Sequence, residues 1–221
     1  MICKSKILNQ ESSIGLGTAL PLALALFVPL FLTQGIGPFD FWWWMTANLL
    51  VLLGLVGFMD PPWRHALVGD LRDHPVRKIV LGLLSAAVLY GIFWVGNQAS
   101  RCLFAGAAHD ISGIYSFQGQ ATALRIVLLM MFVIGPGEEL FWRGFLQRRL
   151  EDTLGRRSGW LAATGIYAAI HVATGNPILV LAAGVCGAFW GWFYLRYRSM
   201  FLNAVSHTVW DIVIFILLPL G

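Results

Sequence analysis

Apolar residues fall in blocks of about twenty along this chain, and short polar stretches separate the blocks. A helix needs about 20 apolar residues to cross a hydrocarbon core about 30 Å thick. Backbone groups in lipid must be hydrogen-bonded internally, so runs of this kind fold as helices. The predicted fold is an all-α, multi-pass membrane helix bundle with about seven spans, at residues 14–36, 39–59, 78–97, 122–142, 158–174, 177–195 and 200–219.

The composition agrees with a lipid environment. Of the 221 residues, 58% are hydrophobic and 12% are charged, and the mean hydropathy is +0.73. Soluble domains carry about a quarter of charged residues, so this chain lies far outside their range. The net charge of +4 is typical of cationic cytoplasmic loops in a membrane protein, and we expect no nucleic-acid partner. The three scattered cysteines form no C-x-x-C pair and say little about redox compartment.

The positions of lysine and arginine predict which way the helices run. Seven spans place twelve of the fifteen basic residues on one side: Lys4, Lys6, Arg64, Arg72, Arg77, Lys78, Arg148, Arg149, Arg156, Arg157, Arg196 and Arg198. The positive-inside rule then puts the N-terminus in the cytoplasm and the C-terminus outside. The apolar run of the first span is longer than the usual 7 to 15 or so residues of a cleavable signal, so we expect a retained anchor. In a prokaryote the membrane would be the plasma (inner) membrane.

Three segments between or beside the spans have recognisable patterns. Residues 60–78 mix charges with apolar side chains, as does a short amphipathic helix lying along the membrane interface. The aromatic cluster at residues 41–44 is typical of headgroup anchoring at the outer end of the second span. Residues 98–121 are expected to form the longest external loop.

Six ionisable residues lie inside the predicted spans, where each costs about 2.5 to 3.5 kcal/mol and is a functional candidate by default. They are Glu138, Glu139 and Arg143 on the fourth span, His171 on the fifth, and His207 and Asp211 on the seventh. The alternating direction of the spans places all six in the cytoplasmic half or near mid-membrane. We therefore expect them to converge on one site.

The spacing of these residues assigns them different environments. Glu139 precedes Arg143 by four residues, the favourable order for an ion pair on one helix face. Glu138 then points about 100° away and is free of that pair. His207 and Asp211 share a face in the same way. The segment Gly135-Pro136-Gly137 is expected to bend or loosen the fourth helix just before the acids.

Three short motifs resemble those of a known family. The pattern E-E-x-x-x-R, F-x-x-x-H and H-x-x-x-N/D characterises the CAAX-processing and bacteriocin-processing (CPBP, or Abi) family of intramembrane proteases, whose type member is the Ras-converting CAAX endopeptidase. This chain has the three motifs in order, each on its own span: Glu138-Glu139-Leu-Phe-Trp-Arg143, Tyr167-Ala-Ala-Ile-His171 and His207-Thr-Val-Trp-Asp211. Tyr167 departs from the pattern, since phenylalanine is usual there, and this change bears on the packing around His171.

The resemblance implies a glutamate-type endopeptidase. In that mechanism Glu138 and His171 activate a water, while His207 and Asp211 stabilise the oxyanion of the tetrahedral intermediate. Glu139 and Arg143 give structural support. An ionised Asp211 cannot donate a hydrogen bond, so it is either protonated or acts by orienting His207. The protease core would cover residues 122–215, and residues 1–121 carry spans and the external loop without a motif.

Other readings of the same residues stay open. The polar residues would also serve as an interhelical network that holds the bundle together. We expect no cofactor, although two histidines with carboxylates are also compatible with Zn²⁺; H-E-x-x-H is absent and the spacing is not that of a zincin. Serine and aspartyl intramembrane proteases are excluded, because no G-x-S-x-G lies on a span and no second intramembrane aspartate pairs with Asp211.

The favoured function is hydrolysis of a peptide bond near the membrane surface, in a cavity that faces the cytoplasm or lies within the membrane. The short loops indicate a membrane-tethered protein or peptide as substrate: a prenylated tail, a leader peptide or a C-terminal sorting helix. The rival is a non-catalytic immunity or scaffold protein of the same fold. A proton-coupled transporter is disfavoured, because its polar residues would be expected in both halves of the chain. The sequence does not indicate an oligomeric state.

Overall fold

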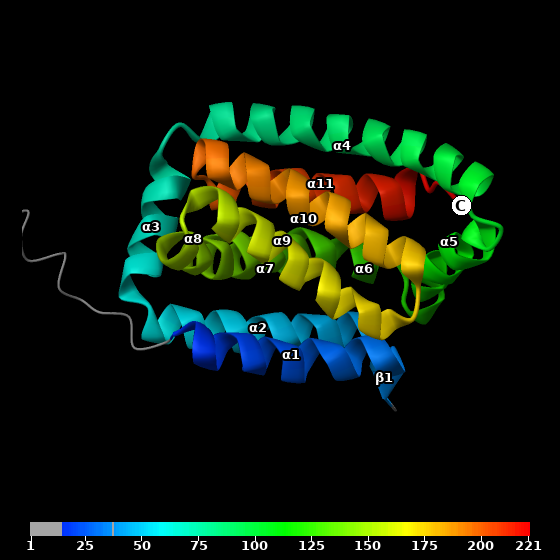
Figure 1. The fold of residues 1–221 in the computed structure, drawn as a ribbon, viewed down its shortest axis with the longest axis horizontal. Helices are drawn as coiled ribbons and strands as arrows, with labels where there is room; N and C mark the ends of the chain where they lie inside the picture. The colour runs from blue at the N-terminus through cyan, green and yellow to red at the C-terminus, as the bar shows by residue number, and fades with distance from the viewer. Residues whose placement is uncertain (1–14, 37) are drawn as a thin grey trace, which may run out of the picture.

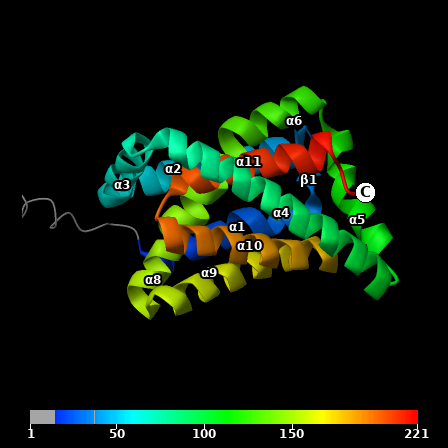
Figure 2. The same cartoon turned by 90° about the horizontal axis from the view of Figure 1, so that it is seen from above.

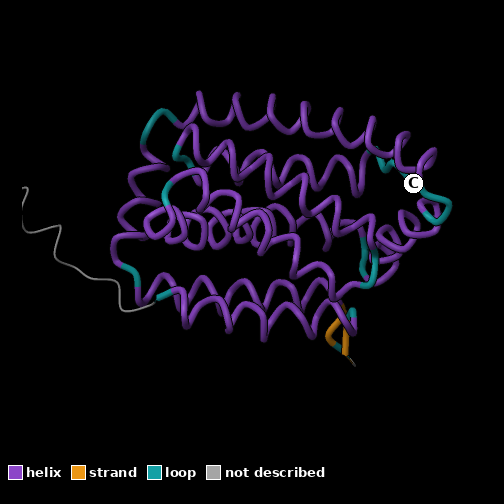
Figure 3. Tube along the Cα trace, in the orientation of Figure 1, coloured by secondary structure: helices purple, strands orange, loops and turns teal. Residues whose placement is uncertain are grey.

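The computed structural model describes residues 15–36 and 38–221, so Cys3, Lys4 and Lys6 lie outside the described residues. The chain folds almost entirely into helices that run back and forth along one axis (Figures 1 and 3). This architecture confirms the all-α membrane bundle.

The elements follow one another with short connections. The N-terminal half contains α1 (Leu16–Thr33), the hairpin of β1 (Gly35–Ile36) and β2 (Phe39–Asp40), α2 (Phe41–Met59), α3 (Pro61–Arg72), α4 (Pro75–Leu103), α5 (Ala107–Tyr115) and the 3₁₀ helix η1 (Ser116–Gln120). A continuous helix then comprises α6 (Ala123–Leu129), η2 (Met130–Ile134), α7 (Gly135–Glu138), η3 (Glu139–Gln147) and α8 (Arg148–Leu154). The remainder consists of α9 (Arg156–His171), η4 (Val172–Thr174), α10 (Pro177–Tyr197), α11 (Met200–Ile212) and η5 (Val213–Leu217).

The predicted count of seven spans is not confirmed. Within the described residues, five helices are long and apolar enough to cross a membrane, and a sixth is reached if the helices at residues 107–120 and 123–154, bent by 98°, count as one span. The helix α9 has only 16 residues, and it begins with Arg156 and Arg157. A helix of that length spans about 24 Å, which is less than a full hydrocarbon core.

The bundle has two different ends. At the end that we call the basic end lie α3, the α8–α9 turn and the α10–α11 turn, which are residues 60–75, 148–157 and 196–200 (Figures 1 and 2). At the opposite end lie the β1–β2 hairpin, α5, η4 and the C-terminus (Figure 1). The aromatic cluster that opens α2 lies at this opposite end, as expected.

Ion pairs tie the segments of the basic end together. Asp60 is fully buried, and its carboxylate accepts from Arg148 at 3.0 Å and from Arg149 at 2.7 Å. The same side chain caps the first turn of α3 by accepting from the backbone N–H of Trp63. Residues 61–72 are helical with Val68 and Leu71 exposed, which confirms the predicted helix, while its position along the membrane interface stays a prediction.

Residues 98–121, which were predicted to form an external loop, are largely helical. The helix α4 continues to Leu103, and residues 107–120 form α5 and η1. This segment is short of long apolar runs, so the span pattern did not reveal it as helical. Its helices fold across the opposite end of the bundle (Figure 1).

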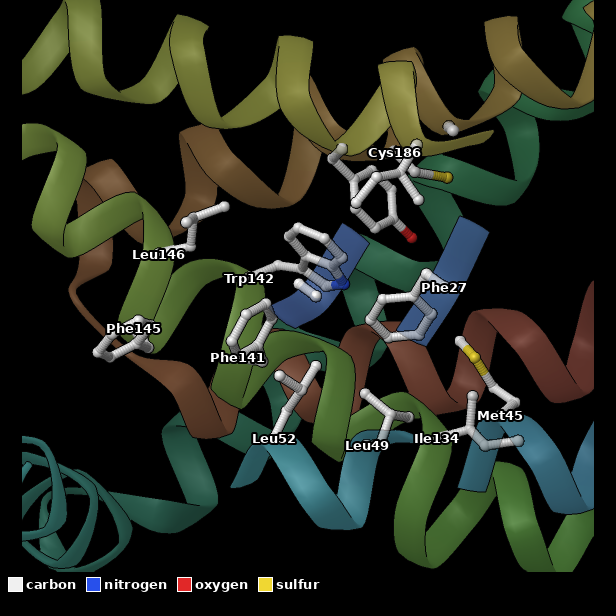
Figure 4. Packing of buried hydrophobic residues seen from close by; sticks show 14 of the residues in the cluster. Phe27, Met45, Leu49, Leu52, Ile134, Phe141, Trp142, Phe145, Leu146 and Cys186 are labelled. Atoms are coloured by element: carbon white, nitrogen blue, oxygen red, sulfur yellow. The ribbon is translucent and has the colours of Figure 1, made fainter. Parts of the chain in front are cut away.

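The core joins the two halves of the chain. Aromatic side chains of η3 pack against α1 and α2, as the close-up in Figure 4 shows for Phe27, Leu49, Phe141 and Trp142. The rings of Phe27 and Trp142 lie 5.7 Å apart. The first two helices therefore form part of the wall around the motif-bearing helix.

One glycine sets how closely the motif-bearing helix approaches α11. A Cβ atom added at Gly135 would lie 2.9 Å from the Cα of Thr208 and 3.1 Å from the carbonyl oxygen of Met130. Backbone atoms cannot yield as a flexible side chain does. The absence of a side chain at Gly135 thus permits the contact that brings Thr208, and with it His207, next to the acids.

We expect Gly135→Ala to destabilise the protein by about 1 to 3 kcal/mol, because an added methyl group must displace α11. The control is Gly165→Ala on α9, where an added Cβ meets no atom within 4 Å. Alanine there favours the helix by about 1 kcal/mol. Thermal unfolding of the purified variants in detergent measures both effects, and an unchanged midpoint for Gly135→Ala would contradict the close approach.

Candidate active site

Motif residues from three helices meet at one cavity. Glu138 lies at the end of α7, His171 at the end of α9, and His207 and Asp211 on α11. All four line a cavity of about 350 Å³. The convergence expected from the sequence is therefore present in the structure.

The helix that carries the two glutamates is widened on both sides of Gly135-Pro136-Gly137. Residues 130–134 and 139–147 are π-helical, and α7 is a short α-helical turn between them. A π-helix makes i→i+5 hydrogen bonds and is frequent at functional sites. The expected loosening of this helix is thus observed, and it takes the form of a wider turn instead of a break.

Glu139 is fully buried, and three side chains donate to it. Its Oε1 accepts from Arg143 Nη1 at 2.9 Å and from His207 Nδ1 at 2.8 Å. Its Oε2 accepts from Asn203 Nδ2 at 3.1 Å. The predicted ion pair between Glu139 and Arg143 is confirmed. With its oxygens occupied in this way, Glu139 is poorly placed to take a proton from a water.

Glu138 has a different environment from its neighbour. It is 6% exposed and lines the cavity. Its Oε2 accepts from the hydroxyl of Tyr167 at 2.6 Å, and no hydrogen bond from the described residues reaches its Oε1. The departure from the family pattern at Tyr167 therefore does more than alter packing, because the extra hydroxyl holds the carboxylate of Glu138.

His171 is oriented by the same tyrosine. Its Nδ1 lies 2.7 Å from the carbonyl oxygen of Tyr167, and since a carbonyl only accepts, Nδ1 carries the proton. In the neutral ring Nε2 is then an acceptor. The ring contacts those of Phe31 and Tyr167, at centroid distances of 4.8 Å and 4.9 Å. These contacts hold the imidazole at the cavity wall.

His207 lies between two carboxylates. Its Nδ1 donates to Glu139, and its Nε2 lies 3.5 Å from Oδ2 of Asp211. The indole of Trp190 stacks on the imidazole with ring centroids 3.7 Å apart and planes 20° from parallel. The ring therefore has little freedom to rotate, and its Nε2 edge points toward the cavity that Asp211 also lines.

Sequence reasoning missed three contributors to the site: the hydroxyl of Tyr167, the amide of Asn203 and the indole of Trp190. Asn203 precedes His207 by one turn, and a polar amide inside a span is a usable signal. Trp190 lies in the largely apolar helix α10, where no pattern distinguishes it from lipid-facing aromatics. Only the packing of α10 against α11 reveals its role.

The cavity extends from these residues away from the basic end. Its walls include the first turn of α2, the C-terminal half of α4, α5, η1 and the N-terminal half of α10. Of the described residues that line it, none belongs to the basic-end segments 60–75, 148–157 or 196–200. A cytoplasm-facing cavity does not fit this lining if the basic loops are cytoplasmic.

Across residues 15–36 and 38–221, no three His, Cys, Asp or Glu side chains are grouped so that they would hold a metal ion.

Comparison with known proteins found a family match in the motif-bearing segment. Residues 120–213 match the family model described as type II CAAX prenyl endopeptidase Rce1-like, which confirms the resemblance inferred from the three motifs. The match agrees with the several apolar helices of the described residues, which are typical of an integral, multi-pass membrane protein. No curated protein and no solved structure gave a significant match to the chain.

The two adjacent glutamates are expected to differ sharply in their effect on stability. Glu139→Gln leaves the Arg143 guanidinium buried without its counter-charge, a change that typically costs about 3 to 5 kcal/mol. Glu138→Gln keeps an oxygen that accepts from Tyr167, so its cost is expected to stay within about 1 kcal/mol. Thermal unfolding in detergent compares the two. Equal destabilisation by both substitutions would show that Glu138 is as structural as Glu139.

Proposed function

We propose that this protein is an intramembrane endopeptidase that hydrolyses a peptide bond of a membrane-tethered protein or peptide, because residues 120–213 match the family model of Rce1-like type II CAAX prenyl endopeptidases. One observation carries the proposal: Glu138 and His171, joined through Tyr167, face one cavity with an acceptor atom each. A base with a free acceptor atom at a cavity wall is the arrangement that general-base activation of a water uses.

Glu138 and His171 act as the water-activating pair. The Oε1 of Glu138 and the Nε2 of His171 are the atoms left over after the bonds to Tyr167 are made. A water held between them loses a proton to Glu138 as its oxygen attacks the carbonyl carbon of the substrate. The same proton then passes to the amide nitrogen, so that the amine leaves in neutral form.

His207 and Asp211 stabilise the oxyanion. A doubly protonated His207 donates from Nδ1 to Glu139 and keeps its Nε2–H for an oxygen in the cavity. A fixed donor of this kind is most effective in a site that excludes bulk water. Asp211, at 3.5 Å from Nε2, either orients the ring as a carboxylate or donates a second hydrogen bond when protonated.

Glu139 and Arg143 support the site without touching the substrate. Neither residue lines the cavity. The guanidinium of Arg143 lies over the rings of Tyr167 and Trp190, at 4.7 Å and 5.5 Å from their centroids. Since Tyr167 holds Glu138 and Trp190 stacks on His207, the ion pair positions both halves of the site.

We expect Glu138→Gln and His171→Ala to lower cleavage by about 10²- to 10⁴-fold, the range that general acid–base groups contribute. The assay uses purified protein in detergent with a library of membrane-tethered candidate substrates, with and without a metal chelator. Gly165→Ala serves as the control for folding and handling. Cleavage lost in both variants but resistant to chelation supports the metal-independent mechanism, whereas loss on chelation moves these residues into a metal site. If the folded wild type and variants are all inert, the immunity or scaffold reading is the better one.

The substitution Asp211→Asn separates the two roles of that residue. An asparagine amide still donates a hydrogen bond but carries no charge to orient a His207 imidazolium. Retained activity is expected if Asp211 acts as a protonated donor. A loss of about 10²-fold or more, of the size seen when an oxyanion contact is removed, is expected if it acts as a carboxylate. The catalytic rate of each variant over a range of pH measures the difference.

A further inference from the structure

The cavity is not closed off from the sides of the bundle. Three of its apolar lining residues are well exposed on the outside of the bundle: Ile92 on α4 is 42% exposed, and Leu181 and Val185 on α10 are 54% and 41% exposed. Gly96 on α4 also lines the cavity and is exposed. The same two stretches of helix therefore face both the cavity and the surroundings.

These residues define one opening, between α4 and α10. In Figures 1 and 2 the C-terminal half of α4 and the N-terminal half of α10 approach the same end of the bundle, where α5 lies. Exposed apolar side chains on the flank of a membrane helix face lipid. The opening is thus lateral, toward the hydrocarbon region, while α5 and η1 lie across the end of the bundle.

The distribution of basic residues indicates on which side of the membrane this opening lies. The basic end contains Arg64, Arg72, Arg148, Arg149, Arg156, Arg157, Arg196 and Arg198. By contrast, Arg101 and Arg125 are the basic side chains near the opposite end in the part of the chain that the structure describes. The positive-inside rule places the basic end in the cytoplasm, so the opening lies in the extracytoplasmic half of the membrane.

We propose that the substrate enters sideways between α4 and α10 from the extracytoplasmic leaflet. This inference rests on the proposed proteolysis and narrows its substrate to one class: an exported polypeptide that an apolar segment or lipid group anchors in that leaflet. The apolar walls of the cavity bind the segment of the substrate that is next to its membrane anchor. The polar residues Glu138, His171, His207 and Asp211, at the inner part of the same cavity, receive the scissile bond.

The first experiment tests the side of the membrane and needs no proteolysis. A protein with Cys102 as its single cysteine, made by Cys3→Ser and Cys186→Ala, carries an exposed thiol near the opposite end. A matched protein with Cys102→Ser and Ser158→Cys carries its thiol at the exposed start of α9, on the basic end. In intact cells a membrane-impermeant maleimide should label Cys102, and should label the Ser158→Cys variant only after permeabilisation. The reverse pattern overturns the proposal.

The second experiment tests the lateral route. In a cysteine-free background, Ala182→Cys places one thiol on the cavity wall. The reagent is N-pyrenylmaleimide dissolved in phosphatidylcholine vesicles that contain the protein, and mass spectrometry follows the modification. Gly96→Trp, at the opening, should slow the reaction several-fold. Gly91→Trp on the same helix should not, because Gly91 is exposed and does not line the cavity.

A second variant guards against a local distortion at Gly96. Leu181→Trp narrows the opening from the α10 side and should slow the same reaction. Equal rates in the Gly91→Trp, Gly96→Trp and Leu181→Trp proteins would show that the reagent reaches the cavity by another route, which overturns lateral entry. Neither labelling experiment depends on cleavage, so a failure of lateral entry is distinguishable from a failure of the proposed proteolysis.

Discussion

The buried carboxylate of Glu139 is the interaction on which the site depends. A charge in an apolar bundle persists only where other groups compensate it, and here Arg143, His207 and Asn203 do so. The first partner lies on the same helix and the other two on α11, so the carboxylate fixes the rotation of one helix against the other. Without that fixed rotation of the two helices, the neighbouring Glu138 and the imidazole of His207 would not share a cavity.

The two ends of the bundle have different roles: ion pairs stabilise the basic end, and the opposite end contains the cavity. At the basic end, buried Asp60 joins the α2–α3 connection to Arg148 and Arg149 at the start of α8, and the buried Glu151 pairs with Arg198. Those pairs close the end around the polar cluster. The opposite end instead has a cavity with largely apolar walls. The proposed hydrolytic site thus lies between an end that ion pairs hold together and an end that contains the cavity.

The apolar helices and the convergence of four buried polar residues were largely predictable, because the cost of burying charge in lipid marks Glu138, His171, His207 and Asp211 in any apolar helix. The helical nature of residues 98–121 was not, since those helices cover the end of the bundle and lack a long apolar run. The partnership of Tyr167 with Glu138 was hidden too. It depends on how α9 packs against a π-helical segment, and hydropathy patterns carry no information about packing between helices.

The last residues of the chain form part of the cavity wall. The backbone N–H of Leu220 donates to the hydroxyl of Tyr115, and its carbonyl accepts from Asn97 at 2.9 Å. Leu220 also lines the cavity. Any polypeptide fused after Gly221, such as an affinity tag, would therefore begin at the wall of this cavity and compete for the space in it. Fusions placed ahead of α1 start from the other end of the bundle and leave that space free.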